Sequence, residues 1–133
     1  MTSNSEIAQA FLQSFWDGAP QKGYALCAPG AVWTFQKSLR SPRYAPVPEA
    51  VEWLNSKLVG EFDPESGYTV EVHNTIEQGE EVAMEYTARG RTRRGDIYEN
   101  NYLVRFTIRN GRITSVRPYF DTHYVHQVLA KLD

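Results

Sequence analysis

The hydrophobic pattern is clearest in the second half of the chain, where it alternates. Apolar side chains occupy every second position from residue 102 to residue 108, which is the period of a half-buried strand. Asn110-Gly111 predicts a tight hairpin turn, because a type I′ turn needs positive φ at both central residues. We expect a return strand over residues 113–120. Asp121 or Thr122 then suits the N-cap of a short helix, whose apolar face is formed by Val125, Val128, Leu129 and Leu132.

The first half of the chain shows mainly helical periodicity. Apolar residues recur at helical spacing between Ser3 and Trp16, and this segment opens with a capping-box motif. A second short helix is expected over Gln21–Leu26, followed by an aromatic strand over Ala31–Phe35 and a loop over Gln36–Pro46. A third helix is predicted over residues 47–58, because its apolar residues share one face.

Two further segments, residues 70–76 and 82–88, alternate between apolar and polar side chains and predict strands. The predicted order is two helices, a strand, a helix, four strands in a meander and a short helix. Helices segregated from an antiparallel sheet define the α+β class. A chain of 133 residues has the length of one domain, so we expect a single domain over residues 1–133.

Three groups of residues in the C-terminal half resemble a known family. They are Tyr98-x-Asn100-x-Tyr102, Asn110-Gly111-Arg112-Ile113 and Tyr119-x-Asp121-Thr122, with Phe106 between the first two. This pattern resembles SnoaL-like proteins, which include polyketide cyclases and ketosteroid isomerase-like members of the nuclear-transport-factor-2-like superfamily. The resemblance implies a cone of the cystatin-like type, in which a strongly curved, mixed or antiparallel sheet carries the N-terminal helices over its concave face. It also implies a protein that works without a cofactor and forms a homodimer through the outer face of its sheet.

The expected strands place an aromatic surface inside this cone. By strand alternation, the concave face carries Trp33, Phe35, Tyr86, Asn100, Tyr102 and Phe120, and the helices close the space with Phe11, Phe15, Trp53 and Leu54. Small-molecule sites are generally apolar pockets with a few polar groups, so the predicted ligand is a small, apolar, oxygenated molecule. The alternative is a plain aromatic core, because such stripes are common in cores.

Four polar residues are candidates for chemistry in this pocket. Tyr102 and Asn100 would polarise a carbonyl or hydroxyl group, as neutral oxyanion donors can. Asp121 and His123 are candidate proton carriers, because histidine titrates near neutrality and a neighbouring carboxylate can orient it. The alternative is that Asp121 caps the last helix and His123 is solvated.

The sequence departs from the family where known mechanisms of the fold place their acids and bases. Laid against the resemblance, the base of ketosteroid isomerases falls on Phe35, and the last-strand acid of epoxide hydrolases and cyclases falls on Pro118. Proline also lacks a donor for a sheet ladder, which predicts an edge or a bulge at Pro118. Two function classes stay open: a cofactor-independent isomerase, cyclase or hydrolase, and a non-catalytic ligand-binding or dimerisation module.

Charge argues against a general nucleic-acid partner. The formal net charge is −2 and the pI is about 5.9, whereas nucleic-acid binding needs a basic surface. One predicted hairpin tip is rich in arginine, with Arg89, Arg91, Arg93 and Arg94. We expect a solvated hairpin end, balanced by Asp96 and Glu99, with a phosphate or nucleic-acid site as the alternative. Arg40 and Arg43, with Tyr44, belong to an expected loop near the cavity mouth, where they are either solvated or hold a ligand carboxylate or phosphate.

The remaining composition bounds the compartment and the chemistry. Cys27 is the only cysteine, so no intrachain disulfide forms, and we expect it to be a small buried hydrophobe in the second helix. No apolar run approaches the roughly 20 residues that span a bilayer, and the N-terminus lacks a signal-peptide pattern. We therefore expect a cytoplasmic protein without a membrane partner. Three histidines without a nearby carboxylate cluster predict no metal site.

Overall fold

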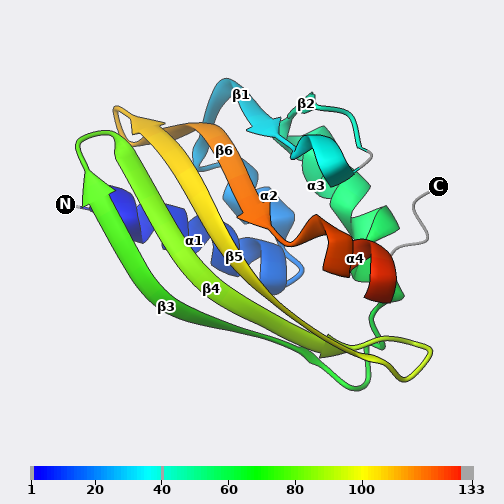
Figure 1. Ribbon diagram of the computed structural model, residues 1–133. Helices are drawn as coiled ribbons and strands as arrows, with labels where there is room; N and C mark the ends of the chain where they lie inside the picture. The colour runs from blue at the N-terminus through cyan, green and yellow to red at the C-terminus, as the bar shows by residue number, and fades with distance from the viewer. Residues whose placement is uncertain (1, 40, 130–133) are drawn as a thin grey trace.

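Six strands form one mixed sheet in the computed structural model, which describes residues 2–39 and 41–129 (Figure 1). The strands are β1 (Cys27–Thr34), β2 (Tyr44–Pro46), β3 (Tyr68–Gln78), β4 (Glu81–Arg91), β5 (Ile97–Arg109) and β6 (Arg112–Phe120). Their order across the sheet is β2-β1-β6-β5-β4-β3. Neighbouring strands are antiparallel except β1 and β6, which run parallel. The predicted α+β class with a curved, mixed sheet is confirmed.

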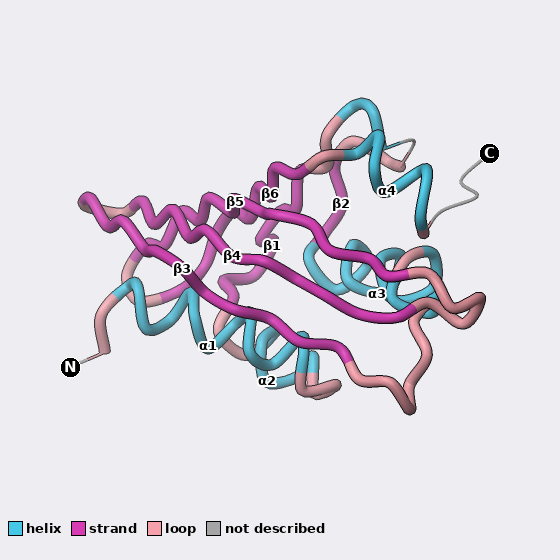
Figure 2. Tube along the Cα trace, turned by 60° about the horizontal axis from the view of Figure 1, so that its bottom comes forward, coloured by secondary structure: helices cyan, strands magenta, loops and turns pink. Residues whose placement is uncertain are grey.

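The helices of the described chain are α1 (Asn4–Trp16), α2 (Pro20–Tyr24), α3 (Val47–Lys57) and α4 (Thr122–Val128), with the 3₁₀ turns η1 (Lys37–Leu39) and η2 (Val59–Glu61). Helices α1 and α3 pack on the sheet, α2 packs on α1 and α3, and α4 contacts η1 and β5. Figure 2 shows α1, α2 and α3 together on one side of the bent sheet. Helix α1 contacts β3, β4 and β6, so it crosses the middle of the concave face.

The first helix begins at the capping box that the sequence predicts. The backbone N–H of Glu6 donates to Ser3 Oγ at 3.1 Å, and the Ser3 N–H donates to Glu6 Oε1 at 3.2 Å. These two bonds satisfy donors that a helix N-terminus otherwise leaves free. The apolar face of α1 is then buried through Ile7, Ala8, Phe11 and Leu12.

The hairpin between β5 and β6 also follows its prediction. Asn110 has φ +51° and Gly111 has φ +75°, which is the left-handed pair that a type I′ turn requires. On β5 every second side chain points inward, whereas β6 buries Ile113, Val116 and Pro118, because the register between the two strands shifts between Thr107 and Ile108. Tyr98, Val104, Phe106 and Ile108 face the core from β5.

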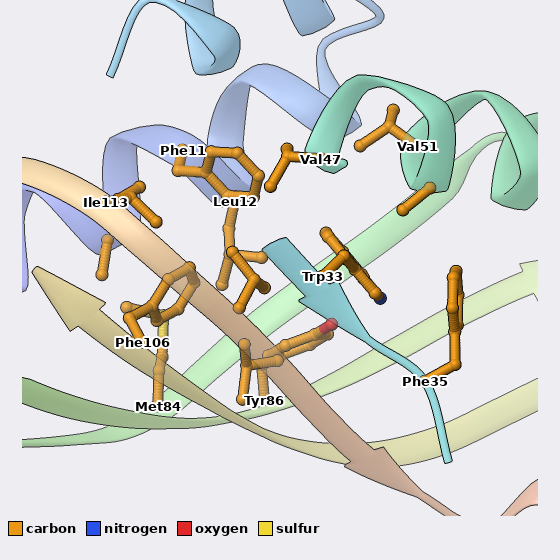
Figure 3. Packing of buried hydrophobic residues seen from close by; sticks show 14 of the residues in the cluster. Phe11, Leu12, Trp33, Phe35, Val47, Val51, Met84, Tyr86, Phe106 and Ile113 are labelled. Atoms are coloured by element: carbon orange, nitrogen blue, oxygen red, sulfur yellow. The ribbon is translucent and has the colours of Figure 1, made fainter. Parts of the chain in front are cut away.

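The hydrophobic core lies between α1, α3 and the concave face (Figure 3). Phe11 of α1 stands edge-on to Phe106 of β5, with ring centroids 5.9 Å apart, and is 6.4 Å from Trp33 of β1. Val47 and Val51 of α3 are fully buried above the same region. Edge-on and tilted aromatic pairs of this kind add to the stabilisation from buried area.

The segment from Cys27 to Pro46 differs from its prediction. Strand β1 begins at Cys27 rather than at Ala31, so Cys27 lies in a strand and not in the second helix. The reason is the parallel partner: Ile113 of β6 pairs with Cys27, and its N–H donates to Leu26 O at 2.9 Å. The register shifts between Cys27 and Val32, which absorbs Pro29-Gly30. The expected loop over Gln36–Pro46 contains η1 and the short strand β2. Arg40 and Leu132, named above, lie outside the described residues.

Pro118 lies in β6, which is an inner strand, and its pairing with Val104 shows no register shift, so the predicted bulge is wrong. On the side of β1, however, the pairs end at Trp33↔Val116, so Pro118 is locally unpaired there. The Phe120 N–H donates to Gln36 Oε1 on this side, at 3.0 Å. Backbone nitrogens two residues apart on a strand point the same way, so the nitrogen of Pro118 points to the same side as that of Phe120. Proline lacks an N–H, and on this side no strand partner needs one.

Replacing Ser3 by alanine tests the capping box. Ser3→Ala removes the side-chain acceptor for the Glu6 N–H, and we expect the free energy of unfolding to fall by about 1 kcal/mol. Urea denaturation followed by circular dichroism measures this loss. Ser3→Asp keeps an acceptor and should stay within a few tenths of the parent value; equal losses in both variants would contradict the cap.

Candidate functional site

A pocket lies between the helices and the concave face of the sheet. Eight predicted residues line it together: Phe11, Phe15, Trp33, Phe35, Leu54, Tyr86, Tyr102 and Phe120. The other lining residues were not predicted: Leu12, Trp16, Leu58, Val59, Phe62, Tyr68, Pro118 and Leu129. Trp53, which the sequence also predicts as a lining residue, does not line the pocket; its ring stands edge-on to the lining residue Phe35, with centroids 5.3 Å apart.

Leu12 and Pro118 lie inside α1 and β6, and most of the other unpredicted lining residues come from turns and from the ends of elements. Trp16 is the last residue of α1 and stands edge-on to Tyr86 at 5.0 Å. Phe62 follows η2 and packs on Tyr68 and Tyr98, at 4.8 and 5.5 Å. Periodicity identifies residues inside a regular element, so it gave no signal for Phe62. For Tyr68 a signal existed, because it continues the alternation of Val70 and Val72 by one step.

The free space in this pocket is about 70 Å³. For comparison, a cavity of about 150 Å³ is known to take up benzene. The pocket therefore has room for a few small atoms as it stands, and a ring-sized ligand requires side chains to move. Seven lining residues are only partly buried and have the most room to move: Phe15, Trp16, Leu54, Val59, Tyr68, Tyr102 and Phe120.

A chain of hydrogen bonds supports the polar end of the pocket. Asn100 Nδ2 donates to Tyr98 Oη at 2.9 Å, and Tyr98 Oη is hydrogen-bonded to Tyr102 Oη. Asn100 Nδ2 also donates to the Asp121 carbonyl at 3.2 Å, while its Oδ1 accepts from the Asn101 N–H at 2.9 Å. Both ends of the Asn100 amide are thus occupied. Asn100 does not line the pocket but positions the two tyrosines, and Tyr102 lines it.

Burial keeps the tyrosines of this region protonated. Desolvation raises the pKa of Tyr98 to about 12, against an ordinary value of 10.0. Burial also raises the pKa of Tyr102, Tyr86 and Tyr68 well above that ordinary value, and the neighbouring tyrosines add to the effect. At neutral pH these side chains are neutral phenols that can donate a hydrogen bond.

Asp121 and His123 lie away from the pocket. Asp121 is the N-cap of α4, and its Oδ1 accepts from the Tyr124 N–H at 3.0 Å, which is the capping role given above as the alternative. His123 is exposed on α4. Neither lines the pocket, so the geometry brings neither of these two candidates to Tyr102. Among the described residues, no carboxylate or imidazole lines the pocket, and no group of three or more His, Cys, Asp or Glu residues could hold a metal ion.

Trp33 presents a polar atom without a partner. Its side chain is 5% exposed, and Nε1 is the one buried side-chain nitrogen or oxygen in the described chain that makes no hydrogen bond. A buried donor left unpaired costs about 1–3 kcal/mol. Figure 3 shows this nitrogen at the inner end of the indole, which extends from β1 toward the side of Phe35 and Tyr86.

The arginines of the β4–β5 tip are engaged locally. Arg89 pairs with Glu99 at 3.3 Å, Arg93 donates to Gly60 O at 2.9 Å, and Arg94 donates to Val128 O at 2.7 Å. These contacts fit the expected solvated hairpin end. Arg43 and Tyr44 are exposed and stack on each other, and neither lines the pocket.

Cys27 is half-buried rather than fully buried as expected, and this partial burial sets the chemistry of its thiol. Desolvation raises the pKa of its thiol to about 11, so the reactive thiolate is scarce at neutral pH.

Helices of the described chain are all too short or too polar to cross a membrane.

The comparisons with known proteins agree with this architecture. The model of the SnoaL-like domain matches residues 8–116, and the chain therefore belongs to the SnoaL-like family. A search of curated proteins found no match.

Solved structures share the fold at low sequence identity. A protein of unknown function from Burkholderia pseudomallei K96243, described as NTF2-like, superposes with a TM-score of 0.79 at 16% identity, covering 97% of this chain and 98% of its own. A protein of Jannaschia sp. CCS1, assigned provisionally as a SnoaL-like polyketide cyclase, gives 0.78 at 19% identity, covering 96% and 92%. TerC, co-crystallised with polyporic acid, gives 0.78 at 20% identity, covering 94% and 96%. These superpositions show a common fold.

The buried tyrosines predict an alkaline limit to stability. Above pH 10.0 the unfolded chain releases tyrosine protons, whereas the folded chain holds that of Tyr98 until about pH 12. The unfolded state then binds fewer protons, so the free energy of unfolding should fall as pH rises from 10 to 12 and should not depend on these groups below pH 9. Urea melts at several pH values measure the slope. Tyr98→Phe should reduce it, and Tyr44→Phe, at an exposed site, should not; equal slopes in all three proteins would refute the assignment.

Proposed function

We propose that this SnoaL-like protein binds a small, apolar molecule with an oxygen acceptor, and that it does so without proton-transfer chemistry. The observation that carries the proposal is the pocket lining. Its described side chains are aromatic or aliphatic, and their polar groups are tyrosine hydroxyls and the indole N–H groups of Trp16 and Trp33. Apolar walls with few polar groups favour a ligand that is itself mostly apolar.

Tyr102 is the proposed donor to the ligand oxygen. Tyr98 has one hydroxyl proton, and its oxygen already accepts from Asn100. Within the described residues its remaining partner is Tyr102, so we assign Tyr98 as the donor to Tyr102 Oη. The proton of Tyr102 is then left for the pocket. A hydrogen-bond chain of this kind strengthens its last donor through polarisation.

The same residues argue against general base catalysis in the pocket. Removing a proton from a carbon needs a base whose conjugate acid has a pKa near the working pH. The tyrosines that line the pocket have raised pKa values and are protonated at neutrality. They can bind and polarise a carbonyl group, but they accept protons poorly.

A matched pair of probes tests the proposal. We expect 1-tetralone, an aromatic ketone, to raise the melting temperature of the protein, because a ligand that binds the folded state alone stabilises it. Tyr102→Phe should weaken binding by about fivefold, the equivalent of one neutral hydrogen bond. Differential scanning fluorimetry and isothermal titration calorimetry measure both effects. Tyr119→Phe, on the outer face of the sheet, is the matched control and should bind as the parent does.

Catalysis of the cyclase type is the second candidate, favoured by the neighbour that is assigned provisionally as a polyketide cyclase. Exchange of the α-protons of 1-tetralone in deuterated water separates the two candidates, because base catalysis at carbon accelerates it. We expect bound 1-tetralone to exchange at the buffer rate. Acceleration by the protein that Tyr102→Phe abolishes would overturn the binding-only proposal in favour of the enzyme.

We further propose that two copies associate through the outer face of the sheet. Every large hydrophobic residue that is exposed in the described chain lies on this face by strand register: Val32, Tyr44, Ile76, Ile97, Leu103 and Tyr119. Leu103 and Tyr119 pair directly across β5 and β6 at 45% and 48% exposure. Ion pairs such as Arg105–Glu81 lie on the same face, so it carries both positive and negative side chains. In a dimer with two-fold symmetry the same face meets itself, and it must therefore offer both signs of charge to be complementary.

Introducing a charge at the centre of this face tests the association. Leu103→Glu should convert a dimer into a monomer of 15.2 kDa at micromolar concentration, measured by analytical ultracentrifugation. Gln9→Glu adds the same charge at an exposed position of α1, away from the outer face of the sheet, and should leave the dimer intact. A monomeric parent protein would contradict the proposed interface.

A further inference from the structure

We infer that the indole N–H of Trp33 is a second hydrogen-bond donor to the ligand, so that the pocket selects neutral molecules that present a carbonyl or ether-type oxygen to β1. This inference rests on the proposed function, because it concerns the same pocket. The strand pattern predicts only that the Trp33 ring lines the pocket as an apolar surface. The inference adds a hydrogen bond from its N–H to the ligand.

The first argument is the contrast with other buried polar groups. Ser14 donates to Phe11 O at 2.7 Å, and Thr122 is hydrogen-bonded to Ser38 at 2.6 Å. The Thr92 hydroxyl accepts from the Asp96 N–H at 3.1 Å, and Asn100 is bonded at both ends. Buried polar groups are normally paired in this way. Within the described chain, Trp33 Nε1 alone departs from the rule, and it does so at the wall of the pocket.

The second argument is the surroundings of the indole. Phe11 and Phe35 flank it, with ring centroids 6.4 and 6.0 Å away, and neither offers an acceptor in the ring plane. The backbone of Trp33 is paired with β2 on one side and β6 on the other. No group of the described chain accepts this N–H, so the pocket that Trp33 lines is the side from which an acceptor can reach it. Tyr86, another lining residue, brings a hydroxyl to the same region.

The third argument concerns the class of ligand. An indole N–H donates and cannot accept, so the ligand group that meets it must be an acceptor. A carboxylate or phosphate would also accept, but no cationic side chain lines the pocket in the described chain, and a buried charge without a partner is strongly disfavoured. A carbonyl oxygen has two lone pairs, so one oxygen can serve Trp33, Tyr102 or both. Neutral ketones, quinones and esters on a ring skeleton fit these requirements.

The experiment compares 1-tetralone with tetralin, the same ring system without the oxygen. For each protein we take the ratio of the two affinities, which cancels the contribution of shape and buried area. Trp33→Phe should lower the ketone-to-hydrocarbon ratio by about fivefold, the equivalent of one neutral hydrogen bond. Trp53→Phe, the same substitution at a residue that does not line the pocket, should leave the ratio unchanged. A ratio that is the same in Trp33→Phe and in the parent overturns the inference.

A second readout is made on the parent protein, so it does not depend on the folding of Trp33→Phe. The chain has three tryptophans, and their indole N–H signals are resolved by ¹⁵N labelling and assigned through Trp16→Phe and Trp53→Phe. We expect 1-tetralone to shift the Trp33 signal downfield and tetralin to leave it near its free position. Equal shifts with both probes, or none with either bound probe, overturn the inference. If neither probe binds at all, the proposed function fails together with it, and this outcome is distinct from binding without the shift.

Discussion

The unbroken antiparallel pairing of β4 with β5 is the constraint on which the rest of the structure depends. From Glu81↔Thr107 to Arg91↔Ile97 the register does not shift. Side chains alternate between the two faces of a strand, so this register sends Tyr86, Asn100 and Tyr102 to the concave face together. A slip of β5 by one residue would turn Asn100 and Tyr102 outward and bring Glu99 and Arg105 into the core.

This constraint also explains how polar groups are tolerated inside the sheet. Tyr98, Asn100 and Tyr102 occupy successive inward positions of β5, close enough for their side chains to satisfy one another. Asn100 additionally ties β5 to the end of β6 through the Asp121 carbonyl. The result is an apolar pocket with a neutral, preorganised donor at one end and the unpaired indole of Trp33 on its wall. Such a site matches the chemistry of an uncharged, oxygen-bearing ligand.

Much of this arrangement could be predicted from the sequence, and the exceptions have physical causes. Local signals were sufficient where one residue decides the geometry, as with the Ser3 cap and the left-handed pair at Asn110-Gly111. Strand alternation was sufficient for Trp33, Tyr86 and Tyr102, because they lie inside strands that bury one face. It failed for Cys27, whose strand exists through a parallel partner more than 80 residues away.

In the predicted site, too, the candidates inside regular strands lie on the predicted face, whereas those beyond the last strand do not reach the pocket. Asp121 and His123 directly follow β6, which ends at Phe120. The chain turns into α4 at this point, so neither side chain lines the pocket. Strand alternation carries no information beyond the end of a strand. Phe62 reaches the pocket from a turn, where no periodicity exists. The free N–H of Trp33 depends on which acceptors surround it in three dimensions, so only the structure reveals it.

A crystal structure of the protein with bound 1-tetralone tests the central claim, that a neutral pocket binds its ligand through its oxygen. The account predicts the ring between α1 and the concave face, with the carbonyl oxygen within about 3 Å of Tyr102 Oη or Trp33 Nε1, the ordinary hydrogen-bond distance. A ligand whose oxygen faces solvent, or lies against a carboxylate or an imidazole, would contradict it.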